Sequence, residues 1–119
     1  RSVAISRDLG KTWREHPTSR KALIEPNCMA SILAYEHPER GKILFFSNPN
    51  AKTKRDHITI KASFDGGMSW PEKNQLELYE EGTYGYSCLT LVDEDHIGIL
   101  YEGTKELYFQ KIPISDLIR

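Results

Sequence analysis

An eight-residue pattern occurs twice in this chain, at positions 6–13 and 63–70. Both copies read Ser-x-Asp-x-Gly-x-(Ser/Thr)-Trp, with the shared residues in register. A pattern that returns in register is an internal repeat, and a repeat restricts the chain to architectures that copy one structural unit. The shared positions are Ser6, Asp8, Gly10 and Trp13 in the first copy, and Ser63, Asp65, Gly67 and Trp70 in the second.

The residue types of the repeat predict a tight turn between two strands. The aspartate (Asp8 or Asp65) accepts hydrogen bonds from nearby backbone N–H groups and closes a loop on itself. The glycine two residues later permits a positive φ, where a Cβ would clash. The tryptophan is expected to bury its ring as the chain returns to a strand. Because local hydrogen bonds account for both aspartates, we expect them to be structural.

Short apolar segments separated by turn residues fill the rest of the chain, without a helical period. We expect strands at 2–6, 22–24, 29–35, 43–46, 57–63, 75–79, 84–92, 96–102 and 107–112, and either an edge strand or a half-turn of helix at 114–118. The polar segments 13–20 and 47–56 predict surface loops. Strands at this spacing, together with the repeat, predict an all-β fold: a partial β-propeller of four-stranded antiparallel blades.

The predicted blades are a partial one at 1–25, a full one at 28–79 and a final one at 84–119. A closed propeller needs at least about four blades, so these alone would leave strand edges exposed. The first residues already resemble a strand, and no initiator methionine precedes them. We therefore expect a C-terminal piece of a longer protein, completed by the remaining blades of the parent chain or by further copies.

Composition excludes several kinds of partner. The net charge of −1 leaves no basic footprint for nucleic acid, and no apolar run is long enough to cross a bilayer. The four histidines lack metal-ligand spacing, and nothing in the sequence indicates a metal or an organic cofactor.

Cys28 and Cys88 lie in apolar, strand-like stretches and are expected to be buried free thiols, with a disulfide between them as the alternative.

The repeat resembles the Asp box of sialidases and related β-propellers, some of which are not sialidases. Three further features resemble the end of the catalytic domain in exo-α-sialidases: Pro26–Ser31, Asn48-Pro49 followed by Arg55, and 86–90 followed by 99–102. They follow the order of that family, and the spacing from Arg55 to Tyr86 is typical of it. The resemblance implies a six-bladed propeller, located outside the cytoplasm in the parent, that hydrolyses terminal sialic acid from glycoconjugates with retention.

The resemblance also implies roles for individual residues. Tyr86 would be the nucleophile, because a neutral phenol avoids repulsion by the sialic acid carboxylate. A phenol has an ordinary pKa of about 10 and needs a base, which in the family is a neighbouring glutamate. Arg55 would bind the substrate carboxylate through its planar guanidinium, with Lys54 as the competing cation. Glu102 would support catalysis by holding a further arginine in place.

The partner glutamate, the acid/base aspartate and two more arginines of the family are expected upstream, and Arg1 lies too close to the first repeat to be assigned to them. We therefore expect the isolated chain to be inactive. Tyr84 would share one side of a strand with Tyr86 and either line the pocket or pack. Two rival functions remain: a propeller that binds sialylated or other acidic glycans without cleaving them, and a structural Asp-box scaffold of an interaction protein.

Overall fold

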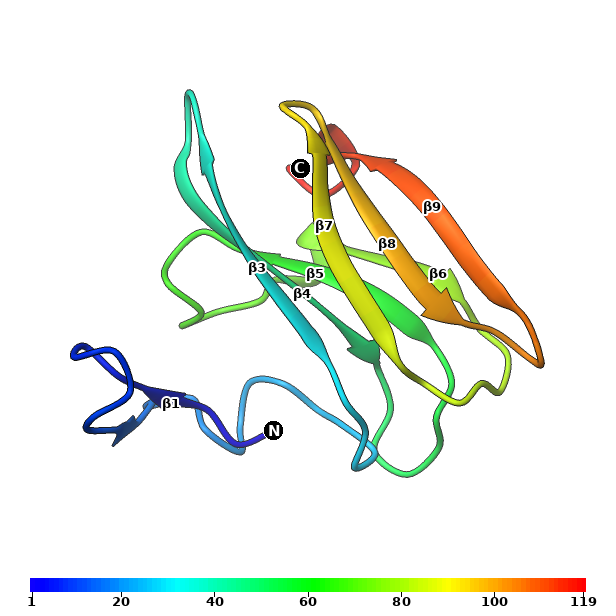
Figure 1. The fold of residues 1–119 in the computed structure, drawn as a ribbon, viewed down its shortest axis with the longest axis horizontal. Coiled ribbons are helices and arrows are strands. Elements are labelled where there is room, and N and C mark those ends of the chain that lie inside the picture. Colours follow the sequence, from blue (N-terminus) through cyan, green and yellow to red (C-terminus); the bar gives the residue numbers. More distant parts are fainter.

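The computed structural model describes residues 1–119, and its strands form three antiparallel sheets (Figure 1). The first sheet pairs β1 (Ala4–Ile5) with β2 (Arg14–Glu15). The second has four strands in the order β3 (Ser31–His37), β4 (Gly41–Pro49), β5 (Ile58–Ser63) and β6 (Gln75–Tyr79). The third has β7 (Ser87–Asp93), β8 (His96–Glu102) and β9 (Leu107–Pro113). Two 3₁₀-helices, η1 (Glu72–Asn74) and η2 (Ile114–Asp116), complete the fold.

Each strand pairs with its neighbours in sequence, so every sheet is a simple meander. This is the arrangement of strands within a propeller blade. The predicted all-β, partial-propeller fold is therefore confirmed, whereas the predicted blade boundaries stay a prediction. The β1–β2 pair lies apart from the two larger sheets (Figure 1).

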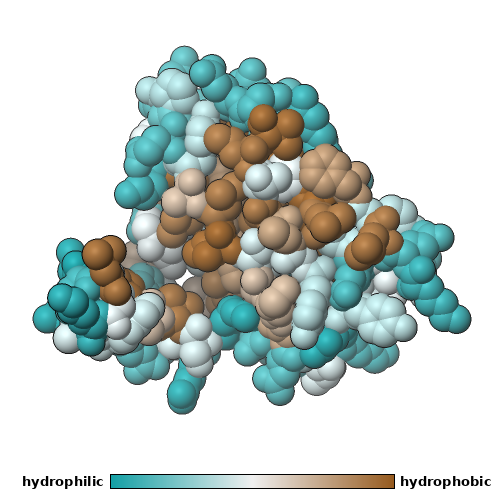
Figure 2. Space-filling view, in the orientation of Figure 1, coloured by the Kyte–Doolittle hydropathy of each residue, from teal (hydrophilic) through white to brown (hydrophobic).

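The apolar core lies between the four-stranded and three-stranded sheets. Twelve buried residues form it, including Ile58 and Ile60 of β5 and Ile97 and Ile99 of β8. Each fully buried side chain of this size stabilises the fold by about 1.5–3 kcal/mol relative to an exposed one. Leu117, just after η2, is also fully buried in this cluster. Figure 2 shows further apolar side chains gathered on the surface over the larger sheets, with hydrophilic ones around the edge.

Both copies of the repeat form the predicted turn. The Ser6 and Thr12 hydroxyls and the Thr12 backbone N–H donate to the Asp8 carboxylate at 2.6–2.9 Å. In the second copy the Ser63 and Ser69 hydroxyls and the Ser69 N–H donate to Asp65 in the same way. Gly10 and Gly67 adopt φ of +88° and +84°. These bonds stabilise the ionised carboxylates: those from Ser69 lower the pKa of Asp65 to about 2, and those from Thr12 lower the pKa of Asp8.

Burial of the first tryptophan is not observed. Trp13 is 64% exposed, because the short β1–β2 pair offers no sheet surface for its ring. Trp70 is half-buried, and its ring lies 5.8 Å from that of the buried Phe46, measured between centroids. The prediction of a buried ring was therefore wrong for Trp13.

Two predictions need correction in the N-terminal segment, and the alternatives left open at the C-terminal end are decided. Residues 22–24 form no strand, because successive turns bend the chain there: the Ser19 N–H donates to the His16 carbonyl, and the Lys21 N–H to that of Thr18. The segment 13–20, predicted as a loop, contains the two-residue β2. Residues 114–118 contain the turn of helix, η2, rather than an edge strand.

Polar composition was misleading at Asn48 and Pro49, which we expected in a surface loop. Strand β4 continues through both, pairing Asn48 with Thr59 and Pro49 with Ile58. Asn48 is fully buried, and its amide nitrogen donates to the Ile24 carbonyl at 2.9 Å. Its Oδ1 is the one buried side-chain polar atom without a hydrogen-bond partner.

The start of β7 and the two cysteines also differ from expectation. Tyr84 and Tyr86 precede β7, which begins at Ser87, because Gly85 with φ of +95° interrupts extended backbone. They therefore do not share one side of a strand. Both thiols are free, but only Cys28 is buried and it lies outside any strand; Cys88 points outward from β7 and is exposed.

Candidate functional site

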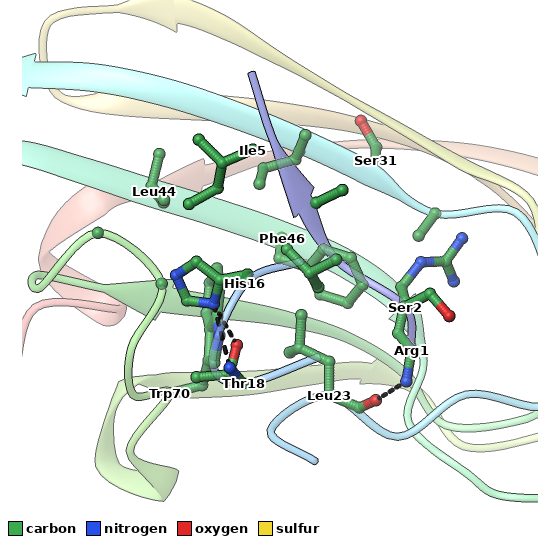
Figure 3. A pocket seen from close by; sticks show the side chains of 16 residues that line it. Arg1, Ser2, Ile5, His16, Thr18, Leu23, Ser31, Leu44, Phe46 and Trp70 are labelled. Atoms are coloured by element: carbon green, nitrogen blue, oxygen red, sulfur yellow. Dashed lines mark hydrogen bonds between the residues drawn. The ribbon is translucent and has the colours of Figure 1, made fainter. Parts of the chain in front are cut away.

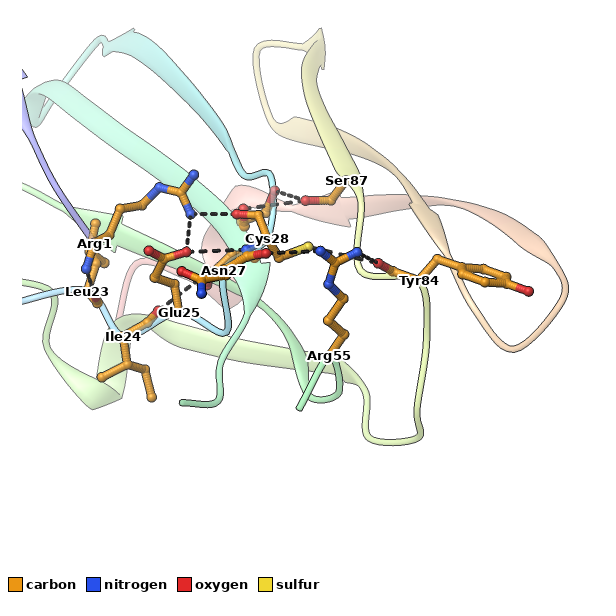
Figure 4. Close-up of polar contacts among 11 residues, drawn as sticks. Arg1, Leu23, Ile24, Glu25, Asn27, Cys28, Arg55, Tyr84 and Ser87 are labelled. Atoms are coloured by element: carbon orange, nitrogen blue, oxygen red, sulfur yellow. Dashed lines mark hydrogen bonds and ion pairs between the residues drawn. The ribbon is translucent and has the colours of Figure 1, made fainter. Parts of the chain in front are cut away.

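The Arg55 guanidinium is held by backbone carbonyls rather than by a carboxylate. It donates from Nη1 to the Tyr84 carbonyl at 3.0 Å and from Nη2 to the Asn27 carbonyl at 2.9 Å (Figure 4). None of the ion pairs in the structure involves Arg55. Its orientation is therefore fixed while its positive charge stays available to an anionic ligand.

Tyr86 lies beside this guanidinium. The central carbon of the Arg55 guanidinium is 5.9 Å from the centroid of the Tyr86 ring, within the range of a cation–π contact. Tyr86 is 46% exposed, so solvent and ligands can reach it. The structure thus brings together the two residues that the sequence singled out, and it leaves the tyrosine accessible.

Glu102, at the end of β8, contacts the backbone of Tyr86. Its Oε2 accepts a hydrogen bond from the Tyr86 N–H at 3.0 Å, and its own N–H donates to the Tyr86 carbonyl at 3.1 Å. Its carboxylate makes no hydrogen bond with the Tyr86 hydroxyl or with an arginine. Within this chain, Glu102 therefore fixes the position of the Tyr86 main chain.

Two hollows adjoin this cluster. One of about 200 Å³ is lined by Met29, Tyr86, Ser87, Cys88, Leu100, Tyr101, Glu102 and Leu107. The other, of about 420 Å³, is lined by Lys54, Arg55, Asp56, Gly82, Thr83, Tyr84, Gly103, Thr104 and Lys105. Arg55 lines the larger hollow and Tyr86 lines the smaller one, so the contact between these two residues connects the hollows.

The two residues weighed as alternatives behave differently from Arg55 and Tyr86. Lys54 is exposed and makes no hydrogen bond or ion pair, so nothing fixes its ammonium group. Tyr84 is 63% exposed at the edge of the larger hollow, so it does not pack in the core. Its structural contribution is its carbonyl, which holds Arg55.

Arg1 is a charged neighbour that the sequence reasoning did not assign. Its guanidinium donates to the Cys28 carbonyl at 2.9 Å and pairs with Glu25 at 3.4 Å. Figure 4 shows Arg1 and Arg55 reaching the Asn27–Cys28 segment from opposite sides. Burial raises the pKa of the Cys28 thiol, while the charges of Arg55 and Arg1 act in the opposite direction. No sequence pattern links positions so far apart, so only the fold reveals this proximity.

A separate hollow of about 400 Å³ lies between the N-terminal segment and the four-stranded sheet (Figure 3). Its walls are mainly apolar and include Leu23, Ile32, Phe46 and Trp70. It contains no tyrosine and no carboxylate, and its histidine, His16, is hydrogen-bonded to Thr18. Its chemistry therefore does not compete with the Arg55–Tyr86 cluster as a catalytic centre.

No group of three or more histidine, cysteine, aspartate or glutamate side chains is placed to hold a metal ion. The two helices of the structure are single turns, and neither approaches the length and apolarity needed to span a membrane.

Comparison with known proteins gives several similar sequences. A sialidase of Bacteroides fragilis is 48% identical over 123 aligned positions, covering 100% of this chain and 23% of that protein. A sialidase of Micromonospora viridifaciens is 35% identical over 86% of this chain and 16% of its own length. An anhydrosialidase of Macrobdella decora is 27% identical over 94% of this chain and 16% of its own length. No family model matches the chain.

A solved structure is similar as well. The Hadza microbial sialidase Hz136 superposes with a TM-score of 0.89 at 43% identity, over 96% of this chain and 23% of that protein. The chain thus spans less than a quarter of the length of each of these four proteins.

Proposed function

We propose that this chain, which belongs to the sialidase family, supplies the part of a sialidase active site that binds the carboxylate of terminal sialic acid and attacks its anomeric carbon. The observation that carries the proposal is the contact between a guanidinium without a carboxylate partner and an accessible tyrosine, Arg55 and Tyr86. The substrate is a sialylated glycan, and its hydrolysis requires no metal or organic cofactor in this proposal.

Arg55 is suited to bind the substrate carboxylate. Two carbonyls fix its guanidinium, so little side-chain entropy is lost on binding, and its charge is not already neutralised. Arg1 offers a second guanidinium on the far side of the Asn27–Cys28 segment, although its pairing with Glu25 offsets part of its charge. Lys54 is less suited because nothing orients it.

Tyr86 is suited to be the nucleophile. In the first step its oxygen forms a bond to the anomeric carbon, and the glycosidic bond breaks with its electron pair leaving on the aglycone oxygen. In the second step water displaces the tyrosine, so two inversions give net retention. The adjacent Arg55 charge favours the negative charge that develops on the phenol oxygen as its proton passes to a base, and this charge is consumed when the new bond to carbon forms.

The site needs groups that this chain does not bring to Tyr86. The phenol proton must pass to a base, and the aglycone oxygen must receive a proton from an acid. Glu102 is not that base, because its carboxylate is engaged with the Tyr86 backbone. We propose that the remaining groups come from the rest of the parent polypeptide, and that the isolated chain does not turn over sialosides.

An exposed apolar sheet face supports this view of an incomplete propeller. Leu100 of β8 and Phe109 of β9 are paired in register and are 46% and 59% exposed. Apolar side chains that share an exposed face generally mark a contact surface. A neighbouring propeller blade would cover this face and complete the layered arrangement of the fold.

The test is hydrolysis of a fluorogenic α-sialoside by the full polypeptide that carries this chain. Tyr86→Phe removes only the nucleophilic oxygen, and we expect it to lower kcat by about 10³-fold or more. Tyr35→Phe is the matched control, because it removes a tyrosine hydroxyl that lies away from the cluster, where it donates to the Glu94 carbonyl. Its activity is expected to be unchanged.

Trapping the intermediate sharpens this test. After reaction with a slow-turnover fluorosialoside, mass spectrometry is expected to find the sugar on the peptide that contains Tyr86. Unchanged turnover by Tyr86→Phe would refute the proposed mechanism. Binding of sialosides without turnover, unaffected by Tyr86→Phe, would favour a glycan-binding propeller instead, and the absence of both would favour an interaction scaffold.

A further inference from the structure

The loop Thr83–Tyr86, called here the clamp loop, is hydrogen-bonded to Arg55 in both directions. The Thr83 N–H donates to the Arg55 carbonyl at 2.8 Å, and the Arg55 side chain donates to the Tyr84 carbonyl at 3.0 Å. One bond fixes the backbone of Arg55 and the other fixes its guanidinium. A shift of the clamp loop therefore moves the guanidinium with it.

The other side of the clamp loop is attached to Glu102. The Thr83 hydroxyl donates to the Glu102 carbonyl and accepts a hydrogen bond from the Gly85 N–H at 3.0 Å. Tyr86 exchanges two further bonds with Glu102, one through the carboxylate and one through the main chain. The clamp loop thus connects the end of β8, which fixes Tyr86, with the segment that carries Arg55.

Gly85 lies at the tightest point of this arrangement. It is buried with φ of +95°, a conformation that disfavours any side chain. A Cβ there would lie 2.7 Å from Cys28 Sγ, 3.1 Å from Pro49 Cγ and 3.2 Å from Arg55 Cδ. These distances are shorter than normal contacts, so a methyl group would push against the stem of Arg55 and the neighbouring Cys28.

We propose that Gly85 is the positioning residue of this site: its lack of a side chain lets the clamp loop hold the Arg55 guanidinium against Tyr86. Gly85 contacts no substrate and acts only through Arg55 and Tyr86. The inference rests on the proposed function, because it assigns the residue that sets the geometry of the carboxylate-binding group.

The test compares binding of the 2-O-methyl α-glycoside of sialic acid with binding of its C1 methyl ester, by titration calorimetry on the full polypeptide. Every protein compared in this titration also carries Tyr86→Phe, so that the glycoside is not hydrolysed. The ester lacks the carboxylate charge, so the ratio of the two affinities measures how well the guanidinium is placed. We expect Gly85→Ala to lower this preference for the acid about tenfold, and to lower kcat/KM for a sialoside about 10²-fold. A general loss of folded protein would lower the apparent binding of both ligands alike and leave the ratio of their affinities unchanged.

Two glycines provide matched controls. Gly82→Ala adds a methyl group beside the same loop, where nothing lies within 4 Å of the new Cβ. Gly66→Ala adds one at φ of +70° in open space and reports the effect of backbone strain alone. Both are expected to keep the preference of the wild type, and a loss equal to that of Gly85→Ala would overturn the role of the close contact.

A second variant decides the question if Gly85→Ala does not fold. Thr83→Val keeps the side-chain volume but removes the hydroxyl that joins the clamp loop to Glu102 and Gly85, and we expect about a fivefold loss of the preference. If the wild type shows no preference for the acid, the proposed function fails. The other outcome is that the wild type prefers the acid while Gly85→Ala and Thr83→Val, where they fold, keep that preference in full. In that case the positioning role of Gly85 is refuted and the proposed function stands.

Discussion

The two Asp-box turns share a sequence pattern and a hydrogen-bond pattern, but they differ in what surrounds them. The first joins the two-residue strands β1 and β2 and leaves Trp13 exposed. The second follows β5 in the four-stranded sheet and lets Trp70 pack on Phe46. The eight residues therefore determine the turn itself, whereas the surrounding sheet determines whether the tryptophan contributes to the core.

Replacing the tryptophans gives the largest expected difference between the two turns. Trp70→Ala removes a half-buried ring in contact with Phe46, and we expect it to lower the free energy of unfolding by about 2 kcal/mol. Trp13→Ala removes an exposed ring and is expected to change it by no more than about 0.5 kcal/mol. Urea unfolding followed by circular dichroism measures both.

Equal effects of the two tryptophan substitutions would contradict this interpretation. They would mean that Trp13 packs as firmly as Trp70, for example against a surface contributed by another part of the proposed parent polypeptide. Measuring Trp13→Ala in both the isolated chain and the full polypeptide shows where the ring packs. If Trp13 packs against another part of the polypeptide, the substitution is destabilising only in the full polypeptide.

The glycines of the two turns are expected to behave alike. Gly10 and Gly67 both have φ above +80°, and a Cβ at either would meet its nearest neighbour at 3.6–3.7 Å, an ordinary contact. Alanine at either position therefore suffers mainly backbone strain, about 1–2 kcal/mol. Hydrogen exchange of the Thr12 and Ser69 N–H groups measures each turn separately, and we expect similar losses of protection for Gly10→Ala and Gly67→Ala.

A much larger loss for Gly67→Ala would show that contact with Leu44, whose Cδ1 would lie 3.6 Å from the added methyl group, outweighs the local strain. That result would extend the difference between the two turns from the tryptophan to the turn itself.

Local patterns were the most reliable part of the sequence reasoning. The predicted strands 75–79 and 96–102 became β6 and β8 with those bounds. Residues 75–79 alternate between polar and apolar side chains, and 96–102 places Ile97, Ile99 and Tyr101 at every second position, where all three are buried. Tertiary context decided the failures. Asn48 looks like a loop residue by composition, but a long-range hydrogen bond to Ile24 allows it to be buried in β4.

The candidate site shows the same difference between what the sequence indicates and what only the tertiary structure reveals. The resemblance to sialidases singled out Arg55 and Tyr86, and their side chains lie together in the structure. The approach of Arg1 to the Asn27–Cys28 segment and the close packing around Gly85 depend on segments far apart in sequence. Neither has a local signature, so single-sequence reasoning had no means of finding them.

Acid titration gives the smallest expected difference between the turns. Both aspartates have folded-state pKa values below the ordinary 3.8, with that of Asp65 near 2. A lowered folded pKa means that the carboxylate stabilises its turn above the unfolded pKa, and that this stabilisation is lost as the pH falls from about 4 towards 2. Carboxyl-carbon NMR is expected to show both midpoints below 3.8, and protection of the Thr12 and Ser69 N–H groups is expected to fall over the same range. Asp8→Asn and Asp65→Asn should each remove this pH dependence from their own turn only; an unchanged dependence would mean that other groups control the acid sensitivity of the turns.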